Sequence, residues 1–179
     1  SSASTRRSSG RRAASTPSHY SVTRPRLAVA IEPITSQARG LADELGCVCI
    51  APDTFRGELT TFIPKAIWLA LTTPQPRVNA DLDAWCTWAE RQEGIDARNL
   101  AVMGFCYGGG KAIRYTTSAR QDAATVVFYG SPLTDAAELR KLQAPVLGVF
   151  GGADLQIPPE LVRRFREALE GSGIAHEVT

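Results

Sequence analysis

A cysteine inside a glycine-rich turn is the residue of this chain best suited to covalent chemistry. Residues 104–109 read GFCYGG, so Cys106 has a glycine two positions before it and another two positions after it. Small residues there permit the sharp turn that exposes a nucleophile between a strand and a helix. Residues 99–103 (NLAVM) have the pattern of a short buried strand, and residues 110–115 (GKAIRY) that of a helix. The spacing therefore predicts a nucleophile elbow with Cys106 as the attacking thiol.

Tyr107 follows the cysteine at the turn. Its backbone N–H is predicted to stabilise the oxyanion of an attacked carbonyl, while the helix N-terminus favours the thiolate. A buried structural cysteine in a glycine-rich turn is the alternative interpretation. Spacing excludes a phosphate-binding P-loop, because the required glycine is replaced by Phe105 and the required Ser or Thr by Ala112.

Asp154 is the candidate acid that would orient a catalytic base. It follows an expected strand at residues 145–150 (PVLGVF), which places it at the carboxyl edge of a parallel sheet. The chain has two histidines. His19 precedes the nucleophile, and His176 begins an expected strand at the opposite edge, so a strand length of about 17 Å separates it from the turn. Neither histidine is therefore predicted to be catalytic.

Strands and helices alternate along the chain, which predicts an α/β fold with a mostly parallel sheet and helices on both faces. The candidate residues follow strands, and sites in such folds lie at the carboxyl ends of strands. The expected strands are 27–31, 47–51, 99–103, 125–129, 145–150 and 176–179, and the expected helices are 36–45, 65–71, 79–92 with Asn79 as its cap, one opening at 110–115, 137–142, and 158–170 ended by Gly171.

Composition divides the 179-residue chain into two parts. Residues 1–26 hold six Arg, eight Ser and no acidic residue, a composition that predicts a disordered leader and resembles an organelle transit peptide. Residues 27–179 carry 14 basic and 18 acidic residues, so no nucleic-acid partner is expected. The sequence contains no apolar window of about 18 residues, so no membrane span is predicted. The expected location is intracellular, either cytoplasmic or organellar if the leader is a transit peptide.

The four cysteines, at positions 47, 49, 86 and 106, lack the spacing of a zinc site. Cys47 and Cys49 would share one face of a strand. Cys47, Cys49 and Cys86 are expected to be buried structural thiols in a reducing compartment.

Four segments together resemble the dienelactone hydrolase (carboxymethylenebutenolidase) family of α/β-hydrolases, from about Leu27 to the end of the chain. They are residues 104–109, 51–53 with 56–57, 128–130, and 145–151 through Asp154. The resemblance implies an α/β-hydrolase-like fold, Cys106 as nucleophile and Asp154 as triad acid. It also implies hydrolysis of a small-molecule lactone or ester without a metal or organic cofactor.

The same resemblance suggests two further residues near the nucleophile. Glu32 matches a glutamate that the family holds beside its resting cysteine, and the backbone N–H of Ile34 would be the second oxyanion donor. The segment from Glu32 to Gly46 is several residues shorter than the family's usual loop and helix. In the family, a strand like residues 176–179 leads into a loop that bears the catalytic histidine and then a helix. The resemblance therefore indicates a domain at residues 27–179 that is incomplete at its C-terminus and slow or inactive as it stands.

Two other functions remain open from the residues alone. A non-catalytic α/β-hydrolase-like protein could bind a small molecule or a partner in the same cleft, because losing the histidine damages chemistry more than it damages a pocket. A redox-sensing thiol at Cys106 is a third interpretation, although no resolving cysteine is evident from the spacing. The sequence makes no prediction of oligomeric state.

Overall fold

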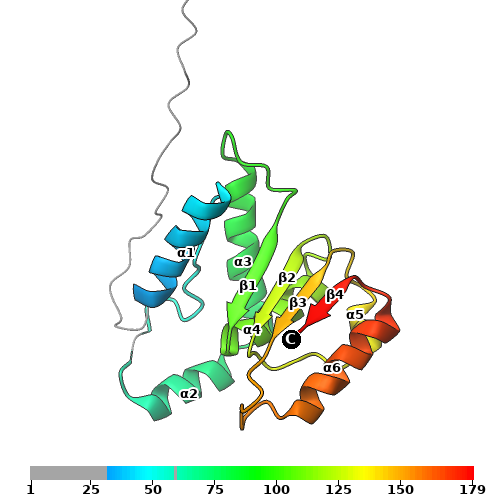
Figure 1. The fold of residues 1–179 in the computed structure, drawn as a ribbon. Helices are drawn as coiled ribbons and strands as arrows, with labels where there is room; N and C mark the ends of the chain where they lie inside the picture. The colour runs from blue at the N-terminus through cyan, green and yellow to red at the C-terminus, as the bar shows by residue number, and fades with distance from the viewer. Residues whose placement is uncertain (1–31, 59) are drawn as a thin grey trace, which may run out of the picture.

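Four parallel strands form the sheet that positions the candidate residues (Figure 1). The computed structural model describes residues 32–58 and 60–179. The strands are β1 (Ala101–Phe105), β2 (Ala124–Phe128), β3 (Val146–Val149) and β4 (His176–Val178), and they lie side by side in chain order. Every neighbouring pair is parallel, so the carboxyl ends of all four strands meet at one edge. This arrangement confirms the predicted parallel α/β sheet.

Six helices accompany the described strands: α1 (Glu32–Leu45), α2 (Ile63–Thr72), α3 (Gln75–Glu90), α4 (Tyr107–Ser118), α5 (Ala136–Leu139) and α6 (Pro159–Ser172). Their existence was predicted, but α1, α2, α3 and α4 begin earlier than expected. Prolines stand in the first turns of α2, α3 and α6. Proline is tolerated there because its missing N–H would have no intrahelical acceptor. Pro74 and Pro76, which precede the expected helix at 79–92, thus lie at the start of α3.

Two predicted helix boundaries are wrong. Asn79 does not cap α3 but lies within it, and its side-chain amide donates to the hydroxyl of Ser118 in α4 at 2.9 Å. The last helix continues past Gly171 and ends before Gly173, which has φ 78°. A left-handed C-terminal residue is the usual position for a terminating glycine because glycine has no Cβ to clash there.

The predicted strand at residues 47–51 is also wrong, because these residues form no strand in the described structure. Its apolar pattern suits a strand, but a strand also needs a neighbour for its backbone hydrogen bonds. The described residues supply none there. The predicted strand at 27–31 and the predicted leader at 1–26 lie outside the described residues.

The core lies on one face of the sheet. Its buried side chains come from β2, β3, the helices α4, α5 and α6, and the turn after α5, and are Ile113, Val127, Leu139, Leu142, Val146, Phe165, Ala168 and Leu169. The other face carries Met103, which is 39% exposed, and the half-buried Phe105 and Phe128. Helices on both faces were predicted, and α4, α5 and α6 supply the helical side chains of the core on this one face. No helix within these residues has both the length and the apolar character to cross a membrane.

The expected burial of three cysteines is wrong. Cys47 is exposed, and Cys49 and Cys86 are only partly buried. Cys86 lies on α3, where its sulfur is 3.5 Å from the hydroxyl of Tyr115 on α4. That hydroxyl also donates to Asp83 at 2.8 Å, and burial, followed by these two partners, raises the pKa of Tyr115 above its ordinary range. The cluster ties α3 to the helix that follows Cys106.

A buried hydroxyl pair joins α4 to β2. Thr125 donates to the hydroxyl oxygen of Thr116 at 2.8 Å, and both residues are fully buried. Thr116 in turn donates to backbone carbonyls of its own helix, those of Ala112 and Ile113, both at 3.2 Å. Removing the Thr116 hydroxyl would therefore deprive Thr125 of its acceptor, whereas removing the Thr125 hydroxyl would leave Thr116 with both of its carbonyl acceptors.

We expect Thr116→Val to lower the free energy of unfolding by about 1–3 kcal/mol, because it leaves the Thr125 hydroxyl buried without its acceptor. Thr125→Val should lower it by less than about 1 kcal/mol, because Thr116 keeps its helical acceptors. Urea denaturation of the two variants and the double variant measures the difference. Equal losses in the two single variants would contradict this assignment of donor and acceptor.

Candidate active site

Cys106 occupies a strained turn between β1 and α4, in the geometry that the sequence predicts. Its backbone has φ 51° and ψ −118°, which is unfavourable for a residue with a Cβ. The neighbouring chain holds it there. The Cys106 N–H donates to the carbonyl of Phe128 at 2.9 Å, and its own carbonyl accepts from the N–H groups of Gly109 and Gly110 at 3.1 and 3.3 Å. The side chain is exposed, as a nucleophile for an external substrate must be.

Two glycines permit the close approach of α4 to the strands. A Cβ on Gly104 would lie 2.2 Å from the carbonyl carbon and oxygen of Gly108. A Cβ on Gly130, after β2, would lie 2.5 Å from the nitrogen of Gly110. Both distances are shorter than any real Cβ contact with backbone. The turn is therefore possible only where these positions have no side chain.

Tyr107 begins α4, so its backbone N–H belongs to the first helical turn, where N–H groups have no intrahelical acceptor. Its ring stacks on Phe55, with ring centroids 5.3 Å apart. The Lys111 ammonium lies 5.3 Å from the centroid of the same ring and donates to the carbonyl of Thr73 at 2.8 Å. Burial, and then the nearby Arg114, lowers the pKa of Lys111. The contacts with Phe55 and Lys111 hold Tyr107 in place, and the backbone N–H of Tyr107 lies beside Cys106.

The loop that carries Phe55 is held by charged and polar contacts. The Asp53 carboxylate accepts from the N–H groups of Phe55 and Gly57 at 2.9 and 2.6 Å. Arg56, with φ 55°, forms an ion pair with Asp81 of α3 at 2.6 Å. Sequence reasoning singled out the segment from its resemblance but missed the Phe55–Tyr107 stack, for which no local pattern exists.

Asp154 lies beyond the carboxyl end of β3, on the same sheet edge as Cys106. One carboxylate oxygen, Oδ1, accepts from the N–H groups of Gln156 and Ile157 at 2.7 and 3.1 Å. These bonds orient the carboxylate and leave Oδ2 for another donor. Strands β1 and β3 are two strand spacings apart, about 10 Å. Two hydrogen bonds of about 3 Å with an imidazole between them would fill most of that distance.

His176 lies at the opposite edge, as expected. It is the first residue of β4 and pairs with Val146 at the start of β3. Val146 pairs with Thr125 of β2, and Thr125 pairs with Val102 of β1. His176 is therefore level with Val102, which lies four residues before Cys106, or about 13 Å along the strand. The His176 Nδ1 lies 2.7 Å from the carbonyl oxygen of Ile174. The ring is therefore out of reach of the thiol. His19 lies outside the described residues.

Glu32 and Ile34 lie in the first turn of α1 rather than in a loop. The side chain of Glu32 is outside the described part of the structure. Ile34 is 39% exposed, and the described residues show no hydrogen bond between it and the elbow. Their roles beside the cysteine stay predictions.

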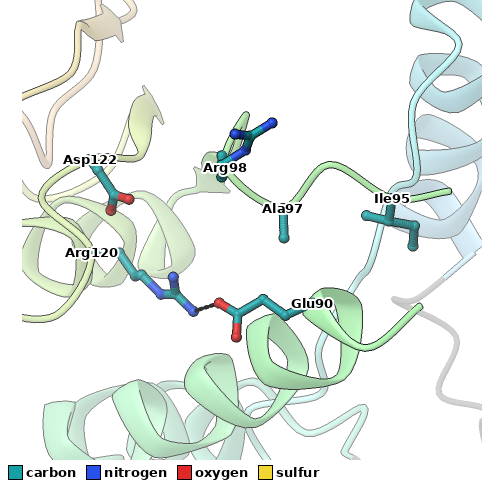
Figure 2. A pocket seen from close by; sticks show the side chains of 6 residues that line it. All are labelled: Glu90, Ile95, Ala97, Arg98, Arg120 and Asp122. Atoms are coloured by element: carbon teal, nitrogen blue, oxygen red, sulfur yellow. Dashed lines mark hydrogen bonds and ion pairs between the residues drawn. The ribbon is translucent and has the colours of Figure 1, made fainter. Parts of the chain in front are cut away.

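Two of the hollows on the described surface bear on the candidate site. The larger, of about 300 Å³, is shown in Figure 2; it contains the Arg120–Glu90 ion pair at 2.6 Å, and Arg98 and Asp122 also line it. Its residues precede β1 and β2 or end α3, so it lies at the amino edge, away from Cys106. The smaller, of about 210 Å³, adjoins the carboxyl ends of β3 and β4 and is lined in part by Gly151, Gly152 and Thr179. Only the second lies on the edge that carries Cys106 and Asp154.

Comparison with known proteins agrees with this geometry. The model of the dienelactone hydrolase family matches residues 29–179. A protein of Salmonella typhimurium assigned as a carboxymethylenebutenolidase is 36% identical over 161 residues, which cover 82% of this chain and 59% of that protein. A carboxymethylenebutenolidase homolog of Rattus norvegicus is 29% identical over 138 residues, and the alignment covers 71% of this chain and 54% of that protein. The chain thus spans little more than half the length of these relatives.

Solved structures show the same fold. The crystal structure of a protein of Klebsiella pneumoniae assigned as a dienelactone hydrolase superposes with a TM-score of 0.72 at 32% identity, over 82% of this chain and 66% of that one. The dienelactone hydrolase-like phosphotriesterase P91 from metagenomic libraries superposes with a TM-score of 0.65 at 23% identity, which shows the shared fold alone. The fold is thus α/β-hydrolase-like, and the chain belongs to the dienelactone hydrolase family of hydrolases.

Proposed function

We propose that this protein hydrolyses a small lactone or ester with Cys106 as its nucleophile. The observation that supports it most directly is the strained and exposed position of Cys106 between β1 and the N-terminus of α4. A strained backbone conformation persists only where surrounding contacts impose it, and such residues are concentrated at active sites. Membership of a hydrolase family supports the same chemistry.

The mechanism begins with attack of the Cys106 thiolate on the carbonyl carbon. A carbon–sulfur bond forms, and the carbonyl oxygen becomes an oxyanion that the Tyr107 N–H stabilises. The unpaired N–H groups at the N-terminus of α4 place partial positive charge beside the reacting atoms. Collapse of the tetrahedral intermediate breaks the bond to the alkoxide and leaves a thioester on Cys106. Water then hydrolyses this thioester and regenerates the thiol.

A general base is the remaining requirement, because it must take the thiol proton and protonate the leaving alkoxide. Asp154 is the residue that would orient an imidazole, with Oδ2 as the acceptor for its N–H. His176 cannot serve, since it lies at the opposite edge. The proposal therefore has two parts. The described residues build the site at which Cys106 is acylated, and a general base must reach the carboxyl edge of the sheet. Glu32 and the Ile34 N–H are proposed as neighbours of the thiol on the family resemblance.

We expect the 179-residue chain to be acetylated by p-nitrophenyl acetate on Cys106, with slow turnover. Added imidazole should accelerate turnover with saturation, by at least about tenfold, because a bound base replaces one that the site needs. The same turnover rate is measured with N-methylimidazole and with phosphate at the same pH. These controls distinguish acceleration by a bound imidazole from general catalysis by the buffer. Intact-protein mass spectrometry counts the acetyl groups, and peptide mapping locates them.

The outcome also distinguishes a binding protein from an enzyme. A folded chain that takes no acetyl group, with or without imidazole, would contradict the nucleophilic role of Cys106. Binding of an unreactive lactone analogue by that same chain would then support the non-catalytic alternative.

A further inference from the structure

Cys47 and Cys49 bring two free thiols together outside the candidate active site. The chain leaves α1 through Gly46, at φ 62°, and the Cys47 N–H donates to the carbonyl of Ala42 at 3.3 Å. Because residues two apart in an extended chain point to the same side, the two sulfurs meet at 3.8 Å. Cys47 is exposed, and Cys49 is partly buried.

Several observations favour redox chemistry over a structural role. A disulfide requires a sulfur separation of about 2.05 Å, so the pair needs to close by less than 2 Å. The segment from 47 to 52 forms no strand in the described structure, so this movement breaks no sheet pairing. A closed metal site needs further ligands, and the described residues contain no cluster of three possible metal-binding side chains. The remaining chemistry of two adjacent thiols is the loss of two electrons.

We propose that Cys47 and Cys49 form a vicinal dithiol that a hydroperoxide oxidises to an intramolecular disulfide. In the first step the Cys47 thiolate attacks the terminal peroxide oxygen, the O–O bond breaks, and Cys47 becomes a sulfenic acid while the alcohol leaves. In the second step the Cys49 sulfur attacks the Cys47 sulfur, the S–O bond breaks, and water leaves. Two thiols and one hydroperoxide thus yield one disulfide, one alcohol and one water.

The surroundings assign the order of the two thiols. Cys47 is the exposed member and meets the peroxide first. Burial, together with the hydrogen bond and charge of Cys47, raises the pKa of Cys49 to about 11. This raised pKa keeps Cys49 largely in its thiol form near neutral pH, so Cys49 reacts poorly with external reagents. Its position beside Cys47 offsets this, because an intramolecular step proceeds at a high effective concentration.

The experiment treats the full chain with one equivalent of cumene hydroperoxide at pH 7.5, blocks residual thiols with N-ethylmaleimide, and maps the peptides by mass spectrometry. We expect the peptide that contains Cys47 and Cys49 to lose two hydrogens and to take no maleimide, and dithiothreitol to reverse both changes. Cys49→Ser should instead trap a sulfenic acid on Cys47 that dimedone labels. Cys47→Ser should abolish the reaction, and Cys86→Ser should leave it unchanged.

Three results would overturn the proposal. The first is a peptide that keeps both thiols while Cys106 oxidises, and the second is over-oxidation of Cys47 with Cys49 still reduced. The third is disulfide formation no faster in the folded chain than in the same chain in 8 M urea; we expect at least a tenfold advantage for the folded chain. None of these readouts depends on hydrolase activity, so failure here leaves the proposed function untouched.

Discussion

Replacing Cys106 with alanine should reduce the rate of acetyl transfer to the protein by at least about 10³-fold, because removing a nucleophile removes the covalent pathway itself. The fold should survive. Cys106 is exposed, and alanine retains the Cβ that the turn already accommodates at φ 51°. Mass spectrometry after incubation with p-nitrophenyl acetate should find one acetyl group per chain in the parent protein and none on this peptide in the variant.

Cys47→Ala is the matched control, since it removes another exposed thiol, whose sulfur contacts Leu41 and Cys49 rather than the elbow. It should leave acetylation of Cys106 unchanged. Circular dichroism of Cys106→Ala must show the parent's spectrum for the comparison to count. Full acetyl transfer in a folded Cys106→Ala variant would place the nucleophile elsewhere and refute the assignment of the elbow.

The elbow could be predicted from the sequence because its determinants are local. The glycines around Cys106 are constrained by the turn itself, and their spacing is visible in six consecutive residues. The positive φ of Cys106 and the short distance from Gly104 to Gly108 are what that spacing implies. The order of Cys106 and Asp154 along the chain likewise placed both on one sheet edge, because each follows a strand of a parallel sheet.

Features that depend on distant partners could not be predicted. Residues 47–51 have the composition of a buried strand, yet a strand also needs a neighbour, and composition does not supply one. The Phe55–Tyr107 stack joins residues far apart in the sequence. The Arg56–Asp81 ion pair is equally non-local, and nothing near Arg56 in the sequence indicates Asp81 as its partner. The start of α3 was missed for a different reason: proline is unfavourable inside a helix, but Pro76 lies in the first turn of α3, where it is tolerated.

The largest loss of stability should come from Gly104→Ala. The added Cβ would lie 2.2 Å from backbone atoms of Gly108, and backbone in the first turn of a helix cannot move aside as a flexible side chain can. We expect the free energy of unfolding to fall by at least about 3 kcal/mol, which is the size of severe overpacking in a core. Urea denaturation measures it, and acetylation of Cys106 should fall with it, because relieving the clash must displace α4 from β1.

Gly108→Ala supplies a control with the same chemical change only four residues away. Nothing lies within 4 Å of a Cβ at Gly108, which is inside α4. Alanine is a better helix former than glycine by about 1 kcal/mol, so this variant should be neutral or slightly more stable than the parent. The test is whether the free energy of unfolding falls in Gly104→Ala but stays the same or rises in Gly108→Ala. A general intolerance of substitutions in the GFCYGG segment would destabilise both variants alike. If Gly104→Ala instead matched the parent in stability and acetylation, α4 would not pack against β1 as closely as described, and the geometric basis of the elbow would fail.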